Sequence, residues 1–505
     1  TRRDEIRAQG ERMAPRLSGA ASLEPSEQPM DPATLDAAVE QLRTQYDPTW
    51  AGWGAPPKFP QASVIEFLLA RRESEMSLGT LRAMASGGMY DQVGGGFARY
   101  AVDRTWTVPH FEKMLYDNAL LARAYLHGWL LSGDRALRRT CEETLDFVLA
   151  ELRGDEGGFY SALDADSEGV EGKFYVWSLE ELRDVLGEDA DTAIAWFGAT
   201  ERGNFEGANV LESRGPEPDD QTRARIRRAL YDARAPRVRP GLDDKRLTSW
   251  NALAIAAFAD AGAALEREDY LDAARTAAGF VLTELRDPRG RMLRTWKDGQ
   301  ARLNGYLEDH AFLLEALLAL YEATFEERWF VEARALADTL IGRFADTERG
   351  GFFTTSDDHE ELVARRKDLE DSPIPSGASS AALGLLRLTA LTGEHRYEAA
   401  AVGHLRLLHE IAPRHPGAFG HLLRALDFHL APTREVALAG DARELARVVR
   451  AELRPHLVLA GGPAEGVPLL EGRAPVDGRP AAYVCERFAC RQPVTEPDEL
   501  AALLD

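Results

Sequence analysis

The sequence predicts a protein dominated by α-helices, built as an (α/α)6 toroid with a small α/β region at its C-terminal end. Two observations support this fold class. Helices that are apolar on nearly every face alternate with helices that carry one apolar stripe. Short connections within each pair alternate with long connections rich in glycine and aromatic residues. Because two concentric rings require a buried helix followed by a half-exposed one, we expect an inner ring of first helices and an outer ring of second helices.

Four segments predict inner helices because almost none of their faces is polar. They span residues 117–131, 250–265, 307–324 and 376–391. A striped helix follows each of them after a short turn, and the stripe is clearest over residues 325–344, where apolar side chains recur at helical spacing. We therefore expect each pair to form an antiparallel helical hairpin.

The spacing of these segments predicts about six hairpins. The inner segments recur at similar steps in the second half of the chain, whereas the step from Asp117 to Trp250 is roughly twice as long and leaves room for two hairpins. Residues 32–89 and 415–430 complete the count. We expect the toroid to occupy residues 30–431.

The character of the sequence changes after the last predicted hairpin. Short β-like runs alternate with helical segments, which predicts a small α/β region over residues 433–505. An odd number of cysteines in a long chain argues against a disulfide framework, so we expect Cys141, Cys485 and Cys490 to be reduced. Cys485 and Cys490 are too few for a zinc site, and we expect them to have a structural role.

The net charge of −23 excludes some classes of partner. Such an excess of negative charge repels phosphate backbones and anionic membrane surfaces, so we expect neither nucleic acid nor a membrane as a partner. No apolar run approaches the roughly 18 residues of a membrane span, and the first residues lack the apolar core of a signal peptide. We therefore expect a cytoplasmic protein. The HExxH and GxSxG signatures of metalloproteases and esterases and a Walker lysine pattern are absent, and we expect neither a metal nor a cofactor.

The long connections all enter inner helices at their N-termini, so they predict a polar mouth at one end of the barrel. Asp117, Asp309 with His310, and Trp250 with Asn251 all lie where such a connection meets an inner helix. The two aspartates are candidate catalytic groups, although Asp is equally favoured as an N-cap. His310 is a candidate acid or base, and a satisfied core histidine is the alternative. Trp250 and Asn251 are candidate ligand contacts.

Five more residues are candidate ligand contacts at this mouth. Trp106 and Tyr160 offer flat faces on which a sugar ring can stack, although packing between hairpins explains them as well. His110 and Glu112 lie in a loop directed at the mouth, where Glu112 could simply open the following helix. Asp164 belongs to the acidic stretch "DADSEGVEG", which could place a second carboxylate across the mouth or remain a solvated loop.

Five stretches carry a resemblance more specific than these patterns. They are "GGMYDQVGGGFARYAVDRTWTVPHFEKMLYDNALLA", "DDKRLTSWNALAIAAFA", "GYLEDHAFLLEALLALYEAT", "PIPSGASSAALGLLRL" and "YVCERFACRQPVTEPDEL". Over essentially its whole length the chain resembles the thioredoxin-like-domain proteins of the spermatogenesis-associated type. The resemblance implies a toroid similar to those of N-acylglucosamine 2-epimerases and six-hairpin glycosidases. It also implies that a thioredoxin-like domain, a possible partner, is absent here and that residues 1–17 are the remnant of its last helix.

The function expected from these observations is a carbohydrate or polyol site at the mouth, with epimerisation or isomerisation by proton transfer as the first hypothesis. Similarity to the epimerases implies paired histidines on inner helices, and only His310 holds a comparable place. One alternative is a binding or scaffold module without chemistry of its own, serving the thioredoxin-like domain. A second alternative is glycoside hydrolysis by paired carboxylates. The chain contains no CxxC motif, so redox chemistry is not assigned to it.

Overall fold

A computed structural model of the chain describes residue 2 and residues 23–360, 364–463 and 466–504. The predicted helix over residues 1–17 lies outside the described residues, apart from Arg2. Within the described residues, no helix is long and apolar enough to cross a membrane.

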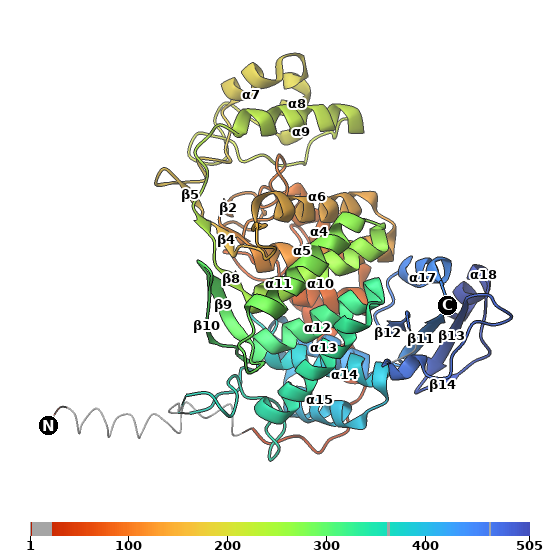
Figure 1. Cartoon of the computed structure of the whole chain (residues 1–505). Helices are drawn as coiled ribbons and strands as arrows, with labels where there is room; N and C mark the ends of the chain where they lie inside the picture. Colours follow the sequence, from red (N-terminus) through yellow and green to blue (C-terminus); the bar gives the residue numbers. More distant parts are fainter. Residues whose placement is uncertain (1, 3–22, 361–363, 464–465, 505) are drawn as a thin grey trace.

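The predicted (α/α)6 toroid is confirmed by a closed inner ring of helices (Figure 1). Neighbours along the ring pack against each other in chain order, and the last helix packs back against the first. Among the described residues the ring has six members: α3 (Ala62–Ala70), α5 (Leu115–Ser132), α10 (Thr248–Leu265), α12 (Leu307–Thr324), α14 (Gly377–Thr392) and α16 (Gly420–Leu430). Nearly all of their apolar side chains are buried, as expected for helices enclosed on every side.

An outer helix covers each inner helix. Five of them follow their inner partner directly: α4 (Ser74–Ser86), α6 (Arg135–Glu151), α11 (Glu268–Glu284), α13 (Glu327–Thr339), which continues as a π-turn over Leu340–Phe344, and α15 (His395–Leu408). The partner of α16 is α2 (Ala33–Gln45), which precedes the whole ring in the chain. Two 3-10 turns, Ala412–Arg414 and Pro416–Ala418, complete the packing around α2.

Local sequence explains the tight turns inside the hairpins. Helices α5 and α14 end at Gly133 and Gly393, which adopt the left-handed φ values of 71° and 73° that glycine tolerates best. In the first of these turns, the side chain of Asp134 then accepts a hydrogen bond from the backbone N–H of Ala136 and caps α6.

The long step between α5 and α10 does not contain two hairpins, and this part of the prediction is wrong. It holds the single hairpin α5–α6 and then a separate lobe of α7 (Leu179–Leu186), α8 (Ala190–Phe197) and α9 (Asp220–Arg234). Figure 1 shows this lobe projecting from the side of the barrel. Its apolar side chains, among them Trp177, Trp196 and Ile226, pack mainly on one another and form a core of their own.

The C-terminal α/β region closes one end of the barrel (Figure 1). Its sheet has the order β12–β11–β13–β14, in which only β11 and β12 are parallel. The elements are β11 (Arg434–Ala439), α17 (Arg443–Arg450), β12 (Leu457–Ala460), the 3-10 turn Pro468–Leu470, β13 (Ala481–Glu486), β14 (Ala489–Cys490) and α18 (Pro497–Leu504). Contacts of β12 with α12 and α14, and of α17 with α10, place this region at the C-terminal ends of the inner helices.

Cys485 and Cys490 form a disulfide bond, so the expectation that both are reduced is wrong. Strands β13 and β14 pair in a register that places the two residues directly opposite each other. Cys141 is a free, buried cysteine.

The long connections gather at the N-terminal ends of the inner helices and form small antiparallel sheets there. The strands are β1 (Tyr100–Ala101), β2 (Pro109–His110), β3 (Lys113–Met114), β4 (Ala162–Leu163), β5 (Asp166–Ser167), β6 (Val170–Glu171), β7 (Leu242–Asp243), β8 (Arg246–Leu247), β9 (Leu293–Lys297) and β10 (Gln300–Asn304). A Gly-Gly-Phe turn recurs in three of these connections and packs against the next outer helix. A Cβ atom at Gly95, for example, would lie 2.4 Å from the carbonyl oxygen of Glu143 in α6.

Candidate functional site

The sequence-predicted residues of the mouth lie in the first turns of α5, α10 and α12, but their side chains have different partners. Asp309 is fully buried, and its carboxylate accepts hydrogen bonds from the backbone N–H of Tyr306, at 2.8 Å, and from that of Ser249, at 3.1 Å. It also pairs with Arg294 at 3.3 Å. Burial raises the pKa of Asp309 to about 7, against the opposing charge of Arg294. Asp309 therefore caps α12 and ties it to the start of α10.

His310 points away from the ring axis, toward the outer layer. Its Nδ1 lies 2.9 Å from the carbonyl oxygen of Tyr306, and its ring packs 4.9 Å from that of Phe344, at the end of the outer helix. It lines a cavity of about 490 Å³ between the α11–β9 connection and α13. Burial lowers the pKa of His310 to about 4, so the imidazole is neutral at physiological pH.

Asn251 holds the chain rather than presenting its amide to a ligand. Its side chain accepts from the backbone N–H of Phe159 at 2.7 Å and donates to the carbonyl oxygens of Phe159 and Leu247, each at 3.0 Å. Asn118, at the equivalent place on α5, makes the same three bonds to Phe97 and to the carbonyl oxygen four residues before it. The repeat therefore explains this residue structurally.

Three more predicted contacts each have a different partner. Trp106 is fully buried, with Nε1 donating to the carbonyl oxygen of Trp50 at 2.9 Å. Tyr160 is half-buried and stacks under the guanidinium of Arg246 at 4.4 Å. Asp164 lies on an exposed loop, where its carboxylate accepts from the backbone N–H of the next residue.

A second group of predicted residues does come together near the start of α5. Trp250 packs edge-on against Tyr116 with ring centroids 4.8 Å apart. Glu112 pairs with Arg99 at 3.1 Å and lies 3.7 Å from His110, which in turn contacts Glu171.

Asp117 lies beside this group, buried to 4% exposure. Its Oδ2 has no hydrogen-bond partner in the part of the chain that the structure describes. Burial raises the pKa of Asp117 well above its ordinary value, more than the charge of Arg99 lowers it. Asp309 and His310 both bond the backbone of Tyr306, whereas Asp117 lies beside Arg99 and Glu112.

A concentration of buried ionisable groups lies inside the ring of inner helices, in a region that we call the lumen. Every inner helix contributes to it at least one charged side chain that is at most 23% exposed. The lumen residues are Glu66 of α3, Arg123 and His127 of α5, Asp260 of α10, Glu315 and Glu322 of α12, Arg387 of α14, and His421 and Arg424 of α16.

Two histidine–carboxylate pairs stand in the lumen. His127 Nδ1 lies 2.8 Å and 2.9 Å from the two carboxylate oxygens of Glu66. His421 Nε2 lies 3.0 Å from Glu315 Oε1, which also accepts from the hydroxyl of Ser380. Because α14 stands between α12 and α16 in the ring, the bond between His421 and Glu315 runs through the interior.

Arginines complete the network. Arg123 donates to Asp260 at 2.6 Å, Arg424 lies 3.4 Å from Glu66, and Arg387 pairs with Glu322. Burial opposes the ionisation of Glu66, but the charges of His127 and Arg424 outweigh it and hold the pKa of Glu66 below its ordinary value.

The same balance acts on the second pair: burial raises the pKa of Glu315, but the charges of His421 and Arg123 and the hydrogen bonds from His421 and Ser380 together outweigh it and lower the pKa to about 2. Both histidines therefore face ionised carboxylates at neutral pH.

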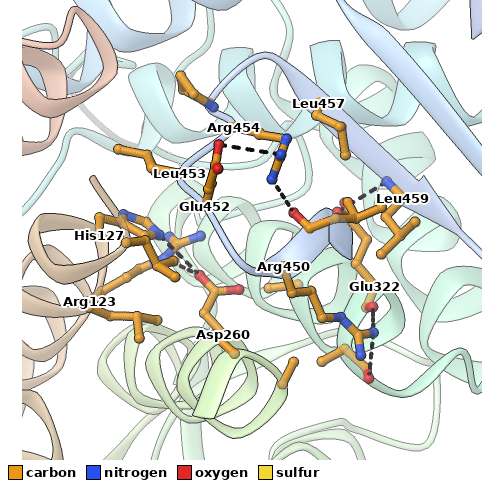
Figure 2. A pocket seen from close by; sticks show the side chains of 18 of the residues that line it. Arg123, His127, Asp260, Glu322, Arg450, Glu452, Leu453, Arg454, Leu457 and Leu459 are labelled. Carbon is orange, nitrogen blue, oxygen red and sulfur yellow. Dashed lines mark hydrogen bonds and ion pairs between the residues drawn. The ribbon is translucent and has the colours of Figure 1, made fainter. Parts of the chain in front are cut away.

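The lumen opens into a cavity of about 150 Å³ at the C-terminal ends of the inner helices. Figure 2 shows Arg123, His127 and Asp260 of the inner helices beside this cavity, together with residues of the α/β region, labelled Arg450, Glu452, Leu453, Arg454, Leu457 and Leu459. The described residues contain no group of three or more His, Cys, Asp or Glu that could hold a metal ion.

Sequence reasoning missed the lumen although a signal for it was present. A charged side chain in the middle of a helix that is otherwise apolar all round is almost never fully buried unless it is paired. Arg123, Asp260 and Arg387 each interrupt such a helix. Polar residues are commonest at helix ends and in loops, so these interior charges stand out less than the residues of the mouth.

Comparisons with known proteins agree with the fold. The chain is 33% identical to spermatogenesis-associated protein 20 from Homo sapiens, over 94% of this chain and 70% of that protein. An uncharacterised protein from Caenorhabditis elegans is 28% identical, over 92% of this chain and 72% of that protein. A sequence profile of the N-acylglucosamine 2-epimerase family matches residues 226–366.

Among solved structures, a GH76 α-mannanase from Bacteroides thetaiotaomicron superposes with a TM-score of 0.50 and 10% identity, covering 79% of this chain and 95% of that one. At this identity the likeness concerns the fold alone.

Proposed function

The chain belongs to the spermatogenesis-associated protein 20 family, and from this premise and the geometry of the lumen we propose that it catalyses proton transfer on a sugar or polyol. The reaction class is epimerisation or isomerisation, in which a proton is removed from a carbon atom next to a carbonyl group and returned at the same or the neighbouring carbon. The partial match to the N-acylglucosamine 2-epimerase profile supports this class, and it includes α10 and α12 of the lumen.

The observation that carries the proposal is the convergence of two histidine–carboxylate pairs inside one ring. An imidazole suits the removal and return of a proton near neutral pH. In this scheme His127 and His421 carry protons, while Glu66 and Glu315 position the rings and stabilise the imidazolium that forms. In this proposal His127 and His421 take the acid and base role that the sequence suggested for His310, because the ring of His310 packs against Phe344 in the outer layer.

Glycoside hydrolysis is the second candidate, and the state of Asp117 favours it. A glycosidase requires a protonated carboxylic acid, and burial favours the protonated form of Asp117. The lumen carboxylates Glu66 and Glu315 suit this role less well, because their cationic partners keep them ionised.

A deuterium wash-in experiment tests the proposal. The protein is incubated in D2O with a panel of aldoses, ketoses and N-acylated amino sugars, and incorporation at the carbon next to the carbonyl is followed by NMR. We expect exchange with at least one sugar, and a loss of about 100-fold or more in His127→Gln and in His421→Gln, as for removal of a general base. His310→Gln is the matched control and should retain exchange.

Two results would contradict the proposal. One is the absence of exchange with every sugar of the panel. The other is an equal loss of exchange in His310→Gln, which would move the chemistry out of the lumen. Release of reducing ends from oligosaccharides that depends on Asp117 would support the hydrolase instead.

A further inference from the structure

We infer that the cavity at the C-terminal end of the lumen binds the anionic group of a small sugar acid or sugar phosphate, and that the α/β region supplies part of this site. This inference rests on the proposed function, because it names the class of substrate that the lumen receives. The shared chemistry is a carboxylate or phosphate attached to a short polyol.

The charge of the cavity lining supports an anionic ligand. Among the described residues that line it, five arginines face three carboxylates. They are Arg123, Arg387, Arg424, Arg450 and Arg454 against Asp260, Glu322 and Glu452. A local excess of positive charge in a chain whose net charge is −23 indicates a place that attracts anions.

In three of these arginines, the guanidinium group has more N–H donors than its paired carboxylate can accept from. Arg123, Arg387 and Arg424 come from three different inner helices, and their side chains retain 16%, 18% and 13% exposure. A guanidinium group has five N–H donors in a planar fork, whereas each of these groups has one carboxylate partner. The fork matches two oxygens of a carboxylate or phosphate.

The arginines also crowd one another, which an anion would relieve. Burial lowers the pKa of Arg424, and the nearby charges of Arg123 and Arg387 lower it further, against the opposing effects of Glu66 and Glu315. An anion bound between these groups would offset both the burial and the repulsion.

The α/β region is anchored firmly enough to form a wall of the site. Arg450 of α17 donates hydrogen bonds to the carbonyl oxygens of Glu322 and Ala323 near the end of α12. The backbone N–H of Leu459 donates to the carboxylate of Glu322 at 3.3 Å. Figure 2 shows Arg450 and Glu322 in contact at one edge of the cavity. The α/β region is thus continuous with the lumen network.

The size of the cavity favours a small ligand. A volume of about 150 Å³ fits an acidic group with a short polyol, and the wall formed by residues 452–459 leaves little room for a chain of sugar units. This distinguishes the expected ligand from the polysaccharides on which glycosidases act.

Matched ligands test the inference by isothermal titration calorimetry. The probes are glucose, glucuronate, glucose 6-phosphate and inorganic phosphate. We expect either glucuronate or glucose 6-phosphate to bind at least tenfold more tightly than glucose. Comparing the affinities of glucuronate and glucose 6-phosphate then shows whether the site prefers a carboxylate or a phosphate. Inorganic phosphate should compete with the preferred anionic sugar.

Substitutions of arginines that line the cavity test whether the anionic group binds there. Arg387→Gln and Arg424→Gln should each abolish most of the preference for the anionic sugar over glucose. Arg424→Lys keeps the positive charge but loses the planar pair of N–H donors of the guanidinium group. This variant should show an intermediate preference for the anionic sugar over glucose. Arg443→Gln on α17 is the control, because this arginine is exposed and pairs locally with Asp441. The ratio of the two affinities depends little on overall stability, so a modest loss of folding does not hide the result.

The outcomes separate this inference from the proposed function. Equal affinities for glucose and both anionic sugars, with deuterium exchange intact, would overturn the anionic class and leave proton transfer standing. Tight binding of an anionic sugar without exchange of any proton would support the site and contradict the reaction. An unchanged preference in both Gln variants would show that the anion binds outside this cavity.

Discussion

The mouth and the lumen of the barrel use buried polar side chains in opposite ways. At the mouth, Asp309 and Asn251 bond backbone groups of their own helix and of the neighbouring chain. In the lumen, Glu66 and Glu315 bond other ionisable side chains. The first turn of a helix leaves backbone N–H groups without partners, so the fold itself requires acceptors there.

The middle of a helix has no such requirement, because its backbone groups already bond each other. A buried charge at that position must therefore be justified by another side chain or by a ligand. The comparison teaches that the partner of a buried polar side chain, a backbone group or another ionisable side chain, separates structural candidates from chemical ones better than its residue type does.

The largest expected effect is at the mouth. Asp309→Ala should lower the free energy of unfolding by about 4 kcal/mol, because it leaves two buried backbone N–H groups without an acceptor and removes a partner of Arg294. Urea denaturation measures the loss. Asp309→Asn should recover part of it, because the amide oxygen of Asn can still accept from one of the two backbone N–H groups. A nearly stable Asp309→Ala protein that has lost deuterium exchange would break the comparison.

The next largest effect is the pH dependence of the free energy of unfolding that arises from Glu315 in the lumen. The pKa of Glu315 is lowered from its ordinary value to about 2, so its contribution is complete above about pH 4.5 and is lost as the pH falls toward 2. The wild type should lose about 2 kcal/mol more than Glu315→Gln between pH 6 and pH 3. Parallel stability curves for the two proteins would mean that His421 and Glu315 are not paired as described.

The smallest effect tests the repeated amide at the mouth. Asn118→Ala and Asn251→Ala should each cost about 1.5 kcal/mol, because each leaves one buried backbone N–H without an acceptor and removes one of the donors to two carbonyl oxygens. The two losses should agree closely, since the bonds are equivalent. If Asn251→Ala alone impaired sugar binding while remaining as stable as the wild type, its place as a ligand contact would be restored.

Hydrophobic periodicity was sufficient to predict the ring. The predicted segment 307–324 coincides with α12, and the segment 376–391 lies within one residue of α14. The inserted lobe was mistaken for a hairpin because its short helices also bury apolar stripes, and the sequence pattern does not tell whether a stripe faces the ring or another helix of the lobe.

The candidate site was harder to predict than the fold. Residues of the mouth such as Trp106 and Asn251 stood out by type and position, yet the structure uses them for packing and for backbone bonds. The pairing of His421 with Glu315 depends on helices distant in the sequence meeting across an axis, which only the closed ring brings about.

The closure of the ring by α2 and α16 has a consequence for synthesis. Helix α2 and the first inner helix leave the ribosome before the rest of the ring, whereas α16, which packs against both, leaves after it. Until α16 emerges, the nascent barrel is an open arc, and Glu66 lacks the charge of Arg424. The charge network of the lumen is thus completed only after every other helix of the ring has been synthesised.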